Sequence, residues 1–126
     1  MLSGRWPRIH LARQHADFRK AIDGLSGEVR RVLEDDPASG HLFVFHNRRR
    51  TALKLLWWDH GGFCLLYKRL ERGRFRLPPF DDERQRELTL TPAELQALME
   101  GLELVKTRRV RVWNPPNSLD KGDRPG

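Results

Sequence analysis

Disulfide chemistry is absent from this chain of 126 residues, because Cys64 is its single cysteine. One thiol cannot form an internal disulfide, a zinc ribbon or a CxxC redox pair. Cys64 lies in an apolar run, where we expect a buried, unreactive thiol rather than a nucleophile. Long apolar stretches are also missing: none approaches the roughly 18 residues of a membrane span. The first residues lack the apolar core of a signal peptide, so we expect a cytoplasmic protein that is not attached to a membrane.

Acidic residues are nearly missing from residues 41–80. This segment holds two acids, Asp59 and Glu71, against nine lysines and arginines, which gives it the entire net charge of +7. The rest of the chain has fifteen bases and fifteen acids, which cancel. A basic excess confined to one block indicates a surface for a polyanion. The nine basic residues are Arg48, Arg49, Arg50, Lys54, Lys68, Arg69, Arg72, Arg74 and Arg76.

Recognisable catalytic motifs are lacking too. The chain has no phosphate-binding P-loop and no nucleophile elbow, and none of its histidines stands at the spacing of a known metal motif. Asp59 and Glu71 lie in predicted turns, where acids commonly cap their own backbone rather than hold two metal ions. We therefore predict no catalytic residue, no metal and no cofactor. Surface or edge positions are expected for the five histidines, His10, His15, His41, His46 and His60.

Apolar runs separated by turn residues predict several β-strands. Residues 9–12 alternate like a short first strand, and residues 59–62 resemble a hairpin turn with glycines. The later connections are too short to cross over between parallel strands, so they favour an antiparallel meander. Its four predicted strands are Leu42–Phe45, Thr51–Trp58, Phe63–Lys68 and Arg74–Leu77.

Two segments have helical periodicity. Apolar residues recur at spacings of three and four over residues 18–35, with Asp17 as a potential N-cap. Thr91, Pro92 and Glu94 have the pattern of a capping box that begins a second helix, and Gly101 marks its end.

These elements predict one α+β domain over residues 1–113. We expect an antiparallel β-meander of four to six strands with two helices packed on one face, which leaves the other face open to solvent or to a ligand. Residues 109–113 alternate like an edge strand, and residues 114–126, which contain three prolines and two glycines, are typical of a disordered tail.

Aromatic residues are interleaved with the basic ones. Trp57 and Trp58 are neighbours on a predicted strand, so their rings face opposite sides and one is expected in the core. An exposed ring beside Lys54 and Lys68 would stack on nucleic-acid bases, with ~1–3 kcal/mol per base. Core packing of both rings is the alternative to base stacking. For Arg48–Arg50, the alternative to binding a polyanion is a solvated hairpin tip.

Several strings resemble a known protein family. SGHLFVF at residues 39–45, LKLLWWD at 53–59 and YKRLERGRF at 67–75 resemble the accessory protein TnpB of insertion-sequence-66-type mobile elements. Residues 17–25 and 90–101 are similar to further segments of that family. The resemblance covers nearly all of residues 9–113, and its departures at Ala16, Phe18 and Ala21 lie outside the basic block.

The resemblance implies a non-catalytic role in transposition, beside a separate transposase and a sister accessory protein. In one hypothesis the chain is associated with the nucleoid and binds DNA, at the element ends or in a transposition intermediate. In another, the same face or the strand at residues 109–113 docks onto the transposase or the sister protein without contacting DNA. A small nuclease that uses Asp59 or Glu71 is a third hypothesis, with little support. The predicted nucleic-acid-binding residues are Arg48, Arg49, Arg50, Lys54, Trp57, Trp58, Tyr67, Lys68, Arg69, Arg72, Arg74 and Arg76.

Overall fold

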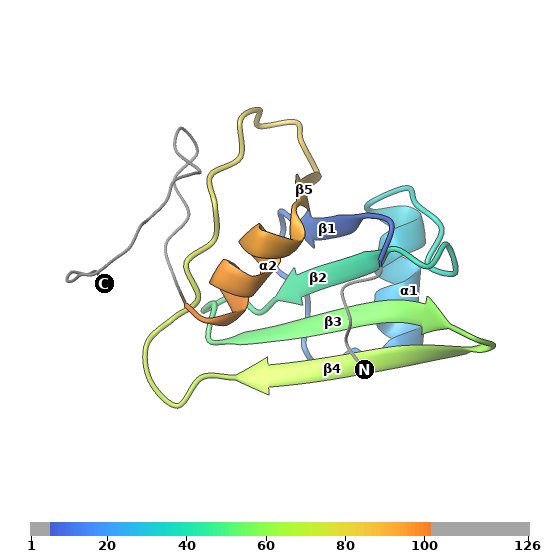
Figure 1. The fold of residues 1–126 in the computed structure, drawn as a ribbon, viewed down its shortest axis with the longest axis horizontal. Helices are drawn as coiled ribbons and strands as arrows, with labels where there is room; N and C mark the ends of the chain where they lie inside the picture. The colour runs from blue at the N-terminus through green and yellow to red at the C-terminus, as the bar shows by residue number, and fades with distance from the viewer. Residues whose placement is uncertain (1–5, 102–126) are drawn as a thin grey trace.

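A computed structural model describes residues 6–101 (Figure 1). The α+β class is confirmed: within these residues, two helices accompany one five-stranded sheet in the order β4-β3-β2-β1-β5. The predicted edge strand at 109–113 and the predicted tail at 114–126 lie outside the described residues. In chain order the elements are β1 (Ile9–Ala12), α1 (Ile22–Arg31), β2 (Leu42–His46), β3 (Ala52–Asp59), β4 (Gly62–Arg69), β5 (Glu87–Leu90) and α2 (Pro92–Met99).

The sheet is mixed, so the prediction of a purely antiparallel meander was wrong. Strands β2, β3 and β4 do form the expected antiparallel meander. Strand β1, however, runs parallel to β2, with Ile9 opposite Leu42, and β5 pairs antiparallel with β1. The connection from β1 to β2 contains α1 and is long enough to return the chain to the same end of the sheet, as parallel pairing requires.

The predicted strand at Arg74–Leu77 was also wrong. No strand is present between β4 and β5, and the alternating pattern has another origin, because the Phe75 side chain is inserted into the core at 1% exposure. Strand β5 lies in a segment for which the sequence patterns predicted no strand.

The helices cover opposite faces of the sheet, not one face as predicted (Figure 1). The central strands have apolar side chains on both faces of the sheet, so each face must pack against another layer of the protein. Strand β2 is buried along its whole length, and no solvent-exposed face remains there for a ligand. The layer under α1 contains Leu25, Val29, Phe43, Phe45 and Leu56. The layer under α2 contains Leu42, Val44, Leu53, Leu55, Leu95 and Leu98.

The two helices differ in how well the sequence indicated their ends. The capping box of Thr91 and Glu94 is present at the start of α2, as predicted. Helix α1 begins at Ile22, later than predicted, because Asp17 caps a preceding turn: its Oδ1 accepts a hydrogen bond from the Arg19 amide. Neither helix of the described region is long and apolar enough to cross a membrane.

Candidate nucleic-acid interface

The turn between β2 and β3 presents three consecutive arginines on a braced support. The Asn47 side chain accepts hydrogen bonds from the backbone amides of Thr51 (2.8 Å) and Ala52 (3.2 Å), and its Nδ2 donates to Thr51 Oγ1 (2.9 Å). These bonds close the turn across its base, so residues 48–50 remain at the end of the sheet with their side chains in solvent.

A second segment lies against this turn. The Leu70 amide donates to the carbonyl oxygen of Thr51 (2.9 Å), and the Phe75 amide donates to that of Arg50 (2.7 Å). Because Phe75 is buried in the core, the intervening residues are held next to the turn. The chain therefore brings two arginine-rich segments, about twenty residues apart in sequence, to one end of the sheet.

We call the resulting group of six side chains the arginine edge. All six are exposed, and none forms an ion pair with a carboxylate of residues 6–101. Arg76 is exposed farther along the same segment but already has an interaction within the protein. Unpaired guanidinium groups on one end of a molecule produce a positive potential there. The arginine edge consists of Arg48, Arg49, Arg50, Arg69, Arg72 and Arg74.

The two lysines of the predicted site are used inside the protein. Lys54 is 8% exposed, and its Nζ donates to the carbonyl oxygens of Phe18 (3.0 Å) and Lys20 (2.7 Å). The same ammonium lies over the rings of Phe18 and Tyr67. Lys68 Nζ donates to the carbonyl oxygen of Met99 (2.7 Å), at the end of α2. We therefore leave both lysines out of the interface.

Lys54 is expected to contribute to stability rather than to binding. Its replacement by methionine leaves two backbone carbonyls without their charged donor, so we expect the free energy of unfolding to fall by about 2–3 kcal/mol. Urea denaturation measures the change. Arg72→Ala, at an exposed position, serves as the control and should stay within about 0.5 kcal/mol of the parent. A Lys54→Met chain as stable as the parent would contradict the buried role of this ammonium.

The three aromatic residues predicted to stack on bases differ in their exposure and packing. Trp57 packs edge-on against Trp6 (5.6 Å between centroids), and Trp58 packs edge-on against Phe63 (4.9 Å). Both tryptophans are half-buried. Tyr67 is instead the exposed large aromatic of the described region, at 56% exposure. An exposed ring for base stacking is therefore available at Tyr67 rather than at either tryptophan.

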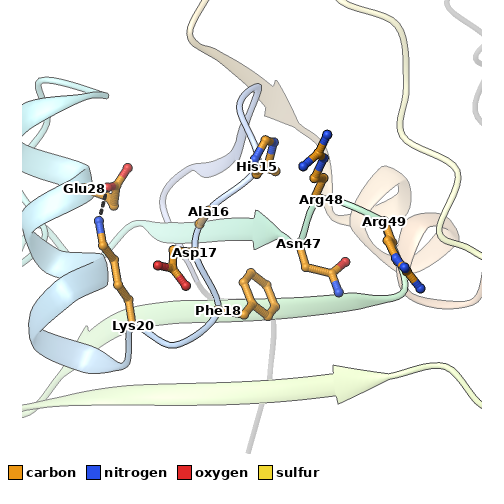
Figure 2. A pocket seen from close by; sticks show the side chains of 9 residues that line it. All are labelled: His15, Ala16, Asp17, Phe18, Lys20, Glu28, Asn47, Arg48 and Arg49. Carbon is orange, nitrogen blue, oxygen red and sulfur yellow. Dashed lines mark hydrogen bonds and ion pairs between the residues drawn. The ribbon is translucent and has the colours of Figure 1, made fainter.

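A polar pocket of ≈ 550 Å³ lies between the loop after β1 and the turn between β2 and β3 (Figure 2). Its acids already have partners: Glu28 Oε2 is 2.6 Å from Lys20 Nζ, and Asp17 binds Arg19 at 2.7 Å. The hydrogen bond from Arg19 keeps the pKa of Asp17 well below its usual range. Net positive charge remains, so the pocket suits an anion. Its lining residues are His15, Ala16, Asp17, Phe18, Lys20, Glu28, Asn47, Arg48 and Arg49.

Sequence reasoning missed this pocket because it depends on the parallel pairing of β1 and β2. That pairing places the ends of both strands side by side, which brings the loop at 13–21 against the turn at 47–51. The Ala16 amide donates to the carbonyl oxygen of His46 (2.9 Å) across this junction. No local sequence signal links the two loops.

A second group of titratable side chains surrounds His10. Its Nε2 is 3.2 Å from His41 Nδ1 and 3.9 Å from Asp35 Oδ2, and its Nδ1 is 3.3 Å from Glu87 Oε2. Burial lowers the pKa of His10 and raises that of Glu87 to about 7. The predicted surface position was wrong for His10 and for His46, which are 4% and 5% exposed.

Other proteins are similar to this chain over most of its length. The model of a family described as "IS66 Orf2 like protein" matches residues 7–109, a range that contains the arginine edge and the pocket. The uncharacterized protein y4hO of Sinorhizobium fredii is 38% identical over 113 residues, which cover 90% of this chain and 94% of y4hO. The uncharacterized protein y4jC of the same organism is 37% identical over 108 residues, or 86% and 90% of the two chains. No solved structure matches.

Proposed function

This chain belongs to the IS66 Orf2-like family, and on that premise we propose that it binds the DNA phosphate backbone through the arginine edge during transposition. Family membership supports a transposition-associated accessory role, within a family not known for catalysis. The observation that carries the DNA-binding proposal is the gathering of six exposed arginines, without a carboxylate partner in the described part of the chain, at one end of the sheet.

Arginine is chemically suited to this role. Its planar guanidinium binds phosphate through two parallel hydrogen bonds and stays charged at every physiological pH. The braced turn and the buried Phe75 hold the two arginine segments in place, which reduces the ordering that binding would require. Phosphate contacts position a protein on DNA but do not read its sequence. Recognition of the element ends would therefore come from other contacts.

The pocket extends the proposed interface toward Tyr67. Arg48 and Arg49 line one side of it, and Phe18 lines another (Figure 2). Phe18 in turn contacts Tyr67 edge-on, with ring centroids 6.1 Å apart. A DNA strand bound at the arginines could thus place an unpaired or distorted base on the exposed Tyr67 ring.

Tyr67→Ala tests this extension. We expect affinity for single-stranded DNA to fall about tenfold, because one base–ring stack contributes roughly 1–3 kcal/mol. Affinity for intact duplex should change little, since stacked base pairs do not reach the ring. Tyr67→Phe keeps the aromatic face and should bind like the parent chain in a fluorescence anisotropy titration. Equal losses for Ala and Phe, or no loss for Ala, would remove Tyr67 from the interface.

The docking of a partner protein is the alternative proposal, and one observation favours it. Strand β4 is eight residues long and, among residues 6–101, lies at an edge of the sheet, where it pairs with β3 alone. A long edge strand offers unpaired backbone groups to an added strand. The transposase or the sister accessory protein could bind there without DNA. Co-purification of the element's proteins after nuclease treatment would support this alternative.

DNA binding is tested first on the full, unmodified chain. We expect saturable binding to a labelled duplex in about 50 mM salt, with affinity that falls steeply as salt is added. Absence of binding to any duplex or single strand at low salt would eliminate the proposal and leave the docking alternative.

A further inference from the structure

The group around His10 has the donor set of a transition-metal site. His10 comes from β1, His41 directly precedes β2, and Asp35 follows α1, so three separate parts of the chain contribute. One ligand atom from each lies within 4.8 Å of the other two. The parallel register of β1 and β2 places the beginnings of both strands next to each other, which explains why residues 31 apart in sequence meet here.

The distance between the two imidazole nitrogens fits a tetrahedral ion. His10 Nε2 and His41 Nδ1 are 3.2 Å apart, and His10 Nε2 and Asp35 Oδ2 are 3.9 Å apart. Metal–ligand bonds of about 2.0 Å at tetrahedral angles require neighbouring ligand atoms to be ~3.3 Å apart. Asp35 Oδ2 is thus about 0.6 Å too far from His10 Nε2, and the three ligand atoms lie within 4.8 Å of one another. The half-buried Asp35 side chain would therefore have to move by up to about 1.5 Å to bind the same ion as both histidines.

The inner nitrogen of His10 provides an independent observation. His10 is almost fully buried, with an exposure of 4%, and its Nδ1 has no hydrogen-bond partner of good geometry within the described region. Glu87 Oε2 lies 3.3 Å from this nitrogen, and Glu87 Oε1 is likewise buried without a partner among those residues. In metal sites the second nitrogen of a ligating histidine usually donates to such an outer carboxylate. A metal on Nε2 would fix the proton on Nδ1 and direct it toward Glu87.

We propose that His10, Asp35 and His41 bind a divalent transition-metal ion, with Glu87 orienting the His10 ring. Two imidazoles and one carboxylate suit Zn²⁺ and its neighbours, whereas Mg²⁺ and Ca²⁺ prefer oxygen donors alone. Three protein ligands leave one position for water, and the half-buried Asp35 and His41 give access from solvent. The ion would cross-link the segment between α1 and β2 to the adjacent strand β1. This site is separate from the arginine edge, which lies at the other end of these strands.

Calorimetric titration of the untagged, chelator-treated full chain with Zn²⁺ tests the site. We expect one ion per chain, a higher melting temperature with Zn²⁺, and no effect of Mg²⁺. His41→Gln and Asp35→Asn each remove a ligand from a partly exposed position, so both should weaken binding by more than about tenfold. Glu87→Gln should weaken it by about tenfold, as loss of an outer partner does. His60→Gln, in the exposed turn between β3 and β4, is the matched control and should bind like the parent.

Two results would overturn the proposal. One is a parent chain that shows no saturable Zn²⁺ binding in the calorimeter. The other is an unchanged dissociation constant in both His41→Gln and Asp35→Asn, which would place the ion on other residues. Substitution with Co²⁺ gives a second readout, because the visible spectrum of a tetrahedral nitrogen and oxygen site is expected in the parent, in His60→Gln and in saturated Glu87→Gln, but not in His41→Gln or Asp35→Asn.

Discussion

A chain in which Arg48, Arg49 and Arg50 are all replaced by glutamate is expected to lose DNA affinity by at least about 100-fold in 50 mM salt. Three of the proposed phosphate contacts would be lost, and three negative charges would face the DNA instead. Fluorescence anisotropy with a labelled duplex measures the loss. The substitutions are at exposed positions of the β2–β3 turn, so melting temperature should confirm that the variant remains folded.

A charge-matched variant separates a local interface from net charge. Arg8 lies just before β1, at the opposite end of that strand from the β2–β3 turn, and Arg30 and Arg31 lie near the end of α1. All three are exposed. Glutamate at these three positions changes the total charge by the same amount. We expect a loss of threefold or so at most, through weaker long-range attraction. Equal losses in the two variants would show that DNA affinity does not depend on the arginine edge.

Phe75→Ala is expected to cause the largest loss of stability, about 3–5 kcal/mol. The ring is 1% exposed in the core layer under α2, and its removal leaves a cavity. The same residue anchors the segment that carries Arg72 and Arg74 against the turn. We therefore expect the variant to bind DNA more weakly even under conditions where it is still folded.

Phe80→Ala is the matched control for this effect. Phe80 lies in the same irregular segment but only partly contributes to the core, and its ring also contacts the Arg13 guanidinium. Its loss should cost about 1 kcal/mol and leave DNA affinity unchanged. Urea denaturation of both variants decides the matter: if Phe75→Ala is no less stable than Phe80→Ala, Phe75 is not the anchor of this segment.

Local patterns predicted the elements that local chemistry determines. The meander of β2, β3 and β4 follows from apolar runs joined by short polar turns, and the start of α2 follows from Thr91 and Glu94. The parallel pairing of β1 with β2 could not be predicted in the same way, because it depends on where α1 packs. The alternation around Phe75 indicated a strand, although a single buried side chain in an irregular segment produces the same pattern.

The candidate site likewise has features that the sequence could predict and features that it could not. The sequence suggested that the arginines of the β2–β3 turn and those after β4 act together, and the structure places the two segments side by side because of the hairpin connectivity. The sequence could not show that Lys54 turns inward, since a lysine on a strand has the same pattern whether its ammonium meets water or two carbonyls. The approach of His10 to His41 needed the parallel register, which the histidine spacing does not contain.

The salt dependence of DNA binding is the most direct test of the arginine edge. If six arginines neutralise duplex phosphates, the logarithm of the association constant should fall with the logarithm of salt concentration with a slope near −5, since each contact contributes about −0.9. The triple glutamate variant at Arg48–Arg50 should show a slope between about −2 and −3. A flat dependence in the parent chain, or a slope that the triple variant shares, would contradict phosphate binding at this edge.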